Sequence, residues 1–166
     1  CVSISTDGAQ ANSSSGFPAI SGDGSIVVFS SSATNLVPGG GNGRTHAFAH
    51  NRNTGQTTRV SVSGAGVQGN HNTSSPAVSS DGRYVVFSSA ASNLVDGDLN
   101  GVADIFLYDR DLALTYLVSY ASDGSQSNNY SSHPWVSSGG RYVVFSSSAT
   151  NLVNGDSNAK TDVFVR

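Results

Sequence analysis

The sequence is poor in charge and in several common residue types. In 166 residues it contains no glutamate, no methionine, a single lysine and a single cysteine. Charged residues make up 11% of the chain, against roughly 25% in ordinary globular domains. Because glutamate, lysine, methionine and glutamine favour helices, their scarcity argues against a helical protein. The single cysteine, Cys1, excludes an internal disulfide framework.

The charge balance and the length of the hydrophobic runs exclude two further classes. Eleven aspartates against eight basic residues leave a formal net charge of −3, and the arginines are spread along the chain instead of clustered. Nucleic acids and anionic membranes are bound by basic surfaces, so neither partner is expected. No apolar run approaches the roughly 20 residues that a membrane-spanning helix requires.

Small polar residues are abundant, with 31 serines, 19 glycines and 14 asparagines. Such a composition also occurs in disordered chains, but the evenly spaced runs of Val, Phe and Tyr argue for a folded β-rich protein. The chain opens at Cys1 and lacks methionine, so we expect a processed product or a fragment. Cys1 is then the point of cleavage, a free thiol, an intermolecular disulfide partner or a lipid-modified first residue.

A repeat of 58 residues runs through the chain without insertion or deletion. Such a period indicates a repeat architecture. Equivalent apolar residues are then expected to share a role. The long loops are expected to be anchored by Leu36, Leu94 and Leu152. The residues expected to be buried between neighbouring repeats are Val27, Phe29, Val85, Phe87, Val143 and Phe145.

One repeat contains four short runs that predict β-strands separated by tight turns. An Asp-Gly pair between two apolar runs is a strong hairpin signal. Four strands per repeat describe a propeller blade better than a sandwich, which has no reason to repeat at this length. In the second repeat the predicted strands are Pro76–Ser79, Arg83–Ser89, Asp104–Tyr108 and Thr115–Tyr120.

The same residues carry a resemblance to a known family. Residues 75–89 read Ser-Pro-x-x-Ser-x-Asp-Gly-Arg-Tyr-Val-Val-Phe-Ser-Ser, and residues 93–106 read Asn-Leu-Val-x-Gly-Asp-x-Asn-Gly-x-x-Asp-x-Phe. This pattern resembles the TolB-like/PD40 (WD40-like) β-propeller repeat. The resemblance implies an all-β ring of six to eight blades used for binding or scaffolding, sometimes beside a hydrolase domain. It also implies an exported protein, secreted or located at the cell surface or in the periplasm.

The repeat boundaries predict an incomplete ring. Residues 1–5 match the end of a fourth strand, residues 6–63 and 64–121 form two complete units, and residues 122–166 form a unit without its fourth strand. Three blades form an arc with two apolar flanks. We therefore expect a homodimer that closes a six-bladed ring, an open filament, or an arc within a longer propeller. In the first two cases, Val2–Ser5 would complete the last blade of another copy.

The loop between the second and third strands predicts a cation site. Oxygen-bearing side chains alternate in this loop, a glycine allows a sharp turn, and a carboxylate follows, as in sites that bind Ca²⁺. The alternative is ordinary turn chemistry, in which Asp and Asn side chains cap loop amides without a metal. The candidate ligands are Asp96, Asp98, Asn100 and Asp104 in the second unit, and Asn154, Asp156, Asn158 and Asp162 in the third.

The segment before the first strand varies most between repeats, and variable loops on a rigid scaffold are common binding sites. Amide and aromatic side chains together suit a carbohydrate or a peptide. The alternative is a solvated loop with the tryptophan packed between blades. The candidate ligand-binding residues are His71, Asn72, Asn129, Tyr130, His133 and Trp135.

Catalysis has little support in the sequence. No serine lies in a nucleophile-elbow pattern, and every aspartate falls in a repeated turn or loop. The chain is therefore expected to be non-enzymatic. The preferred function is a self-assembling structural or scaffold subunit; the alternatives are a ligand-binding propeller, lectin-like or peptide-binding, and a propeller fragment of a hydrolase-associated protein.

Overall fold

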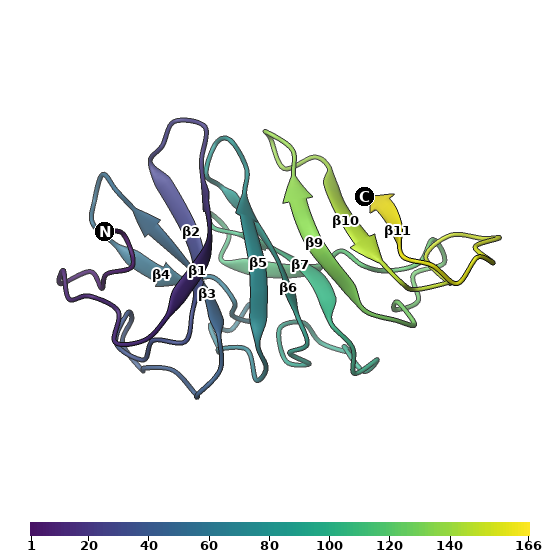
Figure 1. Ribbon diagram of the computed structural model, residues 1–166, viewed down its shortest axis with the longest axis horizontal. Helices are drawn as coiled ribbons and strands as arrows, with labels where there is room; N and C mark the ends of the chain where they lie inside the picture. Colours follow the sequence, from purple (N-terminus) through teal and green to yellow (C-terminus); the bar gives the residue numbers. More distant parts are fainter.

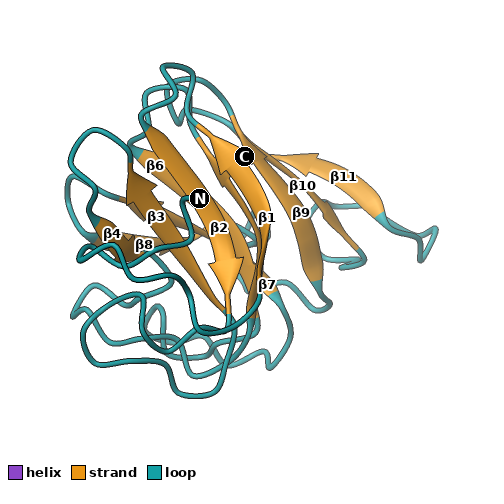
Figure 2. Cartoon of the chain, turned by 60° about the vertical axis from the view of Figure 1, so that its left-hand side comes forward, coloured by secondary structure: helices purple, strands orange, loops and turns teal.

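The computed structural model describes all residues 1–166 and consists only of strands and loops (Figure 2). Eleven strands form three antiparallel sheets, and the strands of each sheet are neighbours in sequence. The predicted all-β propeller fold is confirmed. None of the structure's elements is a helix long and apolar enough to cross a membrane.

Each sheet corresponds to one repeat and is called a blade below. Blade 1 contains β1 (Ser15–Ile20), β2 (Ile26–Ser31), β3 (His46–Asn51) and β4 (Thr57–Arg59). Blade 2 contains β5 (Thr73–Val78), β6 (Tyr84–Ser89), β7 (Asp104–Asp109) and β8 (Leu114–Leu117). Blade 3 contains only β9 (Ser131–Val136), β10 (Val143–Ser147) and β11 (Asp162–Val165).

The blades stand side by side along the long axis, with the two chain ends at opposite ends of the arc (Figure 1). The first strands of the three blades contact one another, β1 with β5 and β5 with β9. They form the inner side of the arc, from which the other strands of each blade extend outward. This arrangement leaves one free flank on blade 1 and another on blade 3.

The first strands begin earlier than the sequence pattern predicted, at Thr73 instead of Pro76 in blade 2. A register shift between Ser74 and Ala77 lets the strand continue past the proline. Ser75 adopts a φ of 50°, a left-handed conformation that is uncommon outside glycine. Phe17 and His133, at the same repeat position, have φ values of 51° and 52°, so all three inner strands carry one irregularity.

The fourth strands are shorter than predicted, because β8 ends at Leu117 and not at Tyr120. Beyond β8 the chain keeps one ladder hydrogen bond, from the Val118 amide to the Ile105 carbonyl at 2.8 Å. Tyr120 then turns away and forms a single antiparallel bridge with Gln126. The outer edge of each complete blade is therefore a short strand followed by a connector that leads to the next blade.

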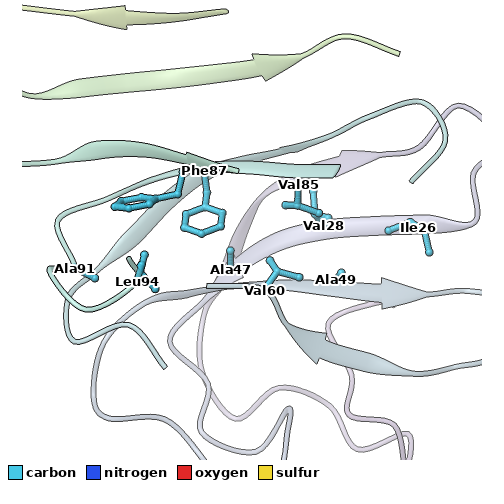
Figure 3. Packing of buried hydrophobic residues seen from close by; sticks show 10 residues of the cluster. Ile26, Val28, Ala47, Ala49, Val60, Val85, Phe87, Ala91 and Leu94 are labelled. Carbon is cyan, nitrogen blue, oxygen red and sulfur yellow. The ribbon is translucent and has the colours of Figure 1, made fainter. Parts of the chain in front are cut away.

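The core lies between blades. The forward face of a blade points toward the next blade along the chain, and the rear face points toward the preceding one. Figure 3 shows side chains of blades 1 and 2 pointing toward one another across this interface. The forward face of blade 1 contributes Ile26, Val28, Ala47, Ala49 and Val60, and the rear face of blade 2 contributes Val85, Phe87, Ala91, Leu94 and Phe106.

The interface between blades 2 and 3 repeats this arrangement. Its forward side contains Ala77, Val86, Ile105 and Val118, and its rear side contains Val143, Phe145, Ala149, Leu152 and Phe164. All six valines and phenylalanines predicted to be buried are buried, as are the three loop leucines. Within residues 1–166, Val27 and Phe29 are nevertheless not between two blades, because they lie on the rear face of the first blade described. Loop residues Ala33 and Leu36 pack beside Phe29.

Candidate functional site

The forward face of blade 3 presents apolar side chains to solvent. Val163 is 73% exposed, whereas Ile105, at the same position of blade 2, is fully buried against blade 3. Val144 is 40% exposed, whereas its equivalent Val86 is fully buried. Val165 is also exposed. The face that forms an interface in blades 1 and 2 is thus open in blade 3.

The rear face of blade 1 is open along its inner strand. Pro18 in β1 is exposed, whereas Pro76 and Pro134 at the same position are buried. In blade 2 the Thr73 amide donates to the Thr45 carbonyl of blade 1 at 2.8 Å, and in blade 3 the Ser131 amide donates to the Ala103 carbonyl at 2.7 Å. The equivalent amide, that of Ser15, has no such acceptor within residues 1–166.

The outer edge of β11 has no partner strand. In blade 2, β7 pairs with β8 through four residue pairs, but β11 pairs only with β10. The segment predicted as a fourth strand, Val2–Ser5, belongs to no sheet and forms one bridge, between Ile4 and Gln10. At one end of the arc the β11 edge has no fourth strand beside it, and at the other end Val2–Ser5 has no sheet to join.

The predicted cation loop of blade 2 is held by hydrogen bonds among its own residues. One carboxylate oxygen of Asp104 accepts from the hydroxyls of Ser119 at 2.5 Å and Ser127 at 2.7 Å, and the other accepts from the Asn100 amide at 2.7 Å. The Asn100 amide also donates to the Ser127 carbonyl at 3.1 Å. Both oxygens of Asp104 thus already serve as acceptors, and this carboxylate links the loop to the segment that follows β8 and to the connector.

Asp98 in the same loop is 4% exposed, and burial together with the nearby charge of Asp104 raises the pKa of its carboxyl. A bound cation would have the opposite effect. In blade 3, Asn158 and Asp162 repeat the amide–carboxylate contact at 3.2 Å. Nowhere do three His, Cys, Asp or Glu side chains come close enough to hold a metal. The Ca²⁺ site, which includes Asp96, Asn154 and Asp156, stays a prediction.

The predicted ligand-binding residues lie in blades 2 and 3, and a binding role for them stays a prediction. The Asn72 side chain accepts from the Thr45 amide at 3.0 Å, and the Asn129 side chain accepts from the Tyr130 amide at 2.9 Å, so both stabilise loops. His71 is exposed in its loop. Hydrogen bonds with the Ser148 and Thr161 hydroxyls lower the pKa of the Tyr130 phenol.

His133 and Trp135 lie on β9 and not in the variable loop. Both contribute to a groove of about 220 Å³ that crosses the three inner strands, lined by equivalent prolines and their neighbours. Trp135 is 69% exposed and occupies the repeat position of Ala77, which is buried at the interface of blades 2 and 3. Trp135 therefore belongs to the open forward face of blade 3.

Comparison with known proteins finds no matching family model and no similar curated protein. Solved structures do match. TolB from Acinetobacter baumannii is 18% identical with a TM-score of 0.55, over 94% of this chain and 30% of that one. TolB from Agrobacterium tumefaciens is also 18% identical, with a TM-score of 0.57, over 92% of this chain and 45% of that one. The fold is that of a TolB-like β-propeller.

A third match is the β-propeller domain of the Trilobed protease from Pyrococcus furiosus, described as having an open velcro topology. It is 11% identical with a TM-score of 0.50, over 93% of this chain and 43% of that one. The chain thus spans less than half the length of the three structures. At these identities the likeness shows the fold alone.

A cavity with a volume of about 930 Å³ lies beside β4. One of its lining residues is Arg59, whose guanidinium stacks over the Phe48 ring at 5.6 Å and donates to the Gly40 carbonyl. The Nε of Arg59 is buried without an acceptor, and no carboxylate lies within salt-bridge distance of this residue. Burial lowers its pKa, as expected for a cation without a counter-ion.

In each blade, asparagine side chains hydrogen-bond the long loop after the second strand to the connector that precedes the blade. The sequence pattern did not single out these residues. Asn12 receives a hydrogen bond from the Thr34 amide and donates one to the Thr34 hydroxyl, both at 2.9 Å. The Asn35 side chain accepts from the Asn12 amide at 2.9 Å and donates to the Gln10 carbonyl at 2.7 Å. The other blades repeat this at Asn70 with Asn93 and at Asn128 with Asn151. The sequence contains a signal for this role, since these asparagines recur at the same 58-residue spacing.

Proposed function

We propose that this protein is a non-enzymatic, exported β-propeller module that assembles with copies of itself as a structural or scaffold subunit. The forward face of blade 3 in one copy packs on the rear face of blade 1 in the next. The observation that carries this proposal is the exposure of Val163 and Val144, whose equivalents Ile105 and Val86 are fully buried in the internal interface. Exposed apolar faces of this kind mark interaction sites.

The internal interfaces serve as the template for this contact. In both, aliphatic side chains of a forward face meet a phenylalanine pair of a rear face, Phe87 with Phe106 or Phe145 with Phe164. Blade 1 carries the same stacked pair, Phe29 with Phe48, at a centroid distance of 5.8 Å, although both rings are already buried against Ala33 and Leu36 of the same blade. Because the two faces differ, the contact is head-to-tail. It closes into a six-bladed ring of two copies or continues as a filament.

The surroundings of three of the four histidines support the non-enzymatic part of the proposal. Nucleophilic hydrolysis requires a hydroxyl or thiol, a histidine and an orienting carboxylate in contact. His46 contacts the Ser61 hydroxyl at 3.2 Å, but its other nitrogen contacts the Asn42 amide oxygen. His50 contacts Thr57 and His133 contacts Ser132, and neither ring has a carboxylate on its other nitrogen.

The molar mass in solution, measured by light scattering over a range of concentrations, tests self-assembly. We expect a mass of at least twice the 17.0 kDa of one chain, and we expect Val163→Asp to reduce it to one chain. Leu99→Asp is the matched control, because Leu99 is 87% exposed in a loop that lies on neither flank. A chain that stays monomeric at every concentration overturns the proposal.

Ligand binding is the second candidate function, and the Arg59 cavity favours it. A half-buried guanidinium without a carboxylate partner suits a carboxylate or phosphate group as ligand. The second repeat has Leu117 at this position, so a leucine there is compatible with the fold. We expect citrate or inorganic phosphate to raise the melting temperature of the wild type but not that of Arg59→Leu. An equal response in both variants rejects this site.

A further inference from the structure

We propose that Asn154 is a site of spontaneous deamidation, and that the fold directs this reaction to one of the three Asn-Gly pairs in the chain. Asparagine is a chemically labile residue, and a following glycine has no side chain to shield its backbone nitrogen. Every Asn-Gly pair is therefore open to the reaction by sequence, and the structure distinguishes among them. The three pairs are Asn42-Gly43, Asn100-Gly101 and Asn154-Gly155.

The reaction consumes only water. The backbone nitrogen of Gly155 attacks Cγ of Asn154, a bond forms between these two atoms, and the bond from Cγ to Nδ2 breaks. The proton of the Gly155 amide leaves with Nδ2 as ammonia, and a succinimide ring remains. Water then opens the ring at either carbonyl carbon, giving its hydroxyl to that carbon and its other proton to the ring nitrogen. The product at position 154 is aspartate or isoaspartate, and nothing is oxidised or reduced.

The Asn100 side chain is held by hydrogen bonds at both of its polar atoms. Its Nδ2 donates to the Asp104 carboxylate at 2.7 Å and to the Ser127 carbonyl at 3.1 Å. Its Oδ1 accepts from the Val102 amide at 3.2 Å. Turning Cγ toward the nitrogen of Gly101 breaks these contacts, and polar groups of a half-buried side chain are costly to leave without partners. We therefore expect Asn100 to react slowly.

The Asn42 side chain is held in the same way. Its Nδ2 donates to the Gly69 carbonyl at 2.9 Å, and its Oδ1 accepts from the Arg44 amide at 3.2 Å. The same Oδ1 lies 2.9 Å from Nε2 of His46, whose side chain is fully buried. Asn42 is thus tied to the interior of the blade interface, and we expect it to react slowly as well.

Asn154 lacks such contacts. Hydrogen bonds hold other side chains of its loop, such as Asn151 and Asn158, but none includes the side chain of Asn154. Both Asn154 and Gly155 are exposed, and beyond the chain neighbours no atom lies within 4 Å of the place where a Cβ of Gly155 would be. Cγ of Asn154 can therefore turn toward the Gly155 nitrogen without the loss of a hydrogen bond within the protein.

Blade 2 shows that this position stays accessible beside a neighbouring blade and that it accepts a carboxylate. The equivalent residue is Asp96, and the following Gly97 has a φ of 78°, against 84° for Gly155. Asp96 is exposed although its loop is held to the next connector, where the Leu99 amide donates to the Gln126 side chain at 3.0 Å. Deamidation to aspartate gives blade 3 the Asp-Gly-Asp sequence that blade 2 already has, so we expect the product to stay folded.

Peptide mapping by mass spectrometry tests the inference. Cleavage after arginine and lysine places the three pairs on separate peptides, residues 1–44, 84–110 and 142–160. The folded protein is incubated at mildly alkaline pH, and the product is followed by the mass increase that accompanies replacement of –NH2 by –OH. We expect Asn154 to react at least about tenfold faster than Asn42 or Asn100, which is about 1.4 kcal/mol in activation free energy. Equal rates, or a faster reaction at either of the other two, overturn the inference.

The same incubation in guanidinium chloride separates the effect of the fold from that of the sequence. We expect the three pairs to react at similar rates there, because the hydrogen bonds that hold Asn42 and Asn100 are lost. If Asn154 keeps its full advantage in the denaturant, the fold does not direct the reaction and the inference is wrong.

Asn154→Gln is the matched variant, because it keeps an exposed amide but lengthens the side chain, so that the five-membered ring cannot close. In the wild type, each reacted chain gains one negative charge beyond the formal net charge of −3. Anion-exchange chromatography of aged folded protein should resolve this acidic species in the wild type and not in the variant. An acidic species that forms at the same rate in both places the reaction elsewhere and rejects the site.

Discussion

The long loops are expected to contribute directly to the stability of the blades, and Leu94→Ala measures that contribution. Leu94 lies in the loop between β6 and β7, is 1% exposed, and packs in the cluster that joins blades 1 and 2. The substitution removes three buried carbon atoms. At about 0.8 kcal/mol for each, the transfer cost alone is about 2.4 kcal/mol.

A cavity term adds to this cost because the loop cannot collapse into the space. The Asn93 side chain accepts from the Asn70 amide at 2.9 Å and donates to the Gln68 carbonyl at 3.0 Å, which fixes the backbone next to Leu94. Nearby Ala91 and Gly69 are too small to fill the gap. We expect a total loss of about 3–4 kcal/mol, within the range observed for buried leucines.

Urea denaturation and thermal melting provide the assay. For a chain of this size, the expected loss corresponds to a melting temperature lower by roughly 6–16 °C. Leu99→Ala is the matched control, since it makes the same chemical change in the same loop at a side chain that is 87% exposed. If the two variants unfold at the same midpoint, the loop is not anchored and the reasoning is refuted.

Three further predictions concern titration, the loop carboxylate and the predicted metal. Burial, and then the charge of Arg59, lower the pKa of His46 from 6.5 to about 4; the unfolded chain therefore binds a proton first as the pH falls. Stability should be full above pH 6.5 and decline toward pH 4, by at most about 2 kcal/mol at pH 5, and pH-dependent urea denaturation should show a flatter profile in His46→Asn. Asp104→Asn should cost about 1.5–3 kcal/mol, because the charge that accepts from Ser119, Ser127 and Asn100 is lost. An unchanged denaturation midpoint would show that this carboxylate is not an anchor. Excess EDTA should lower the melting temperature of the wild type only if the loop holds Ca²⁺, and an unshifted melting curve rejects the metal.

The sequence determined the blade architecture because the fold is periodic and the period is visible in a single chain. Burial of Phe87 or Leu94 follows from a local rule: the same apolar residue returns every 58 positions on the same face of the same strand. Where a proline followed a left-handed residue, as at Ser75 and Pro76, the pattern misplaced the start of the strand, because the irregularity that lets β5 continue is not visible in the residue types.

The contacts of the polar and flanking residues depend on how distant segments of the chain come together, which the repeat pattern does not specify. Asp104 and Asn100 have a pattern typical of a cation loop, yet their hydrogen-bond partners Ser119 and Ser127 lie 15 and 23 residues beyond Asp104. Trp135 is exposed although Ala77, at the same repeat position, is buried. A repeat specifies what each blade can present to its neighbours, but burial also requires a neighbour. That requirement is met between blades 1, 2 and 3 and unmet at both ends of the arc.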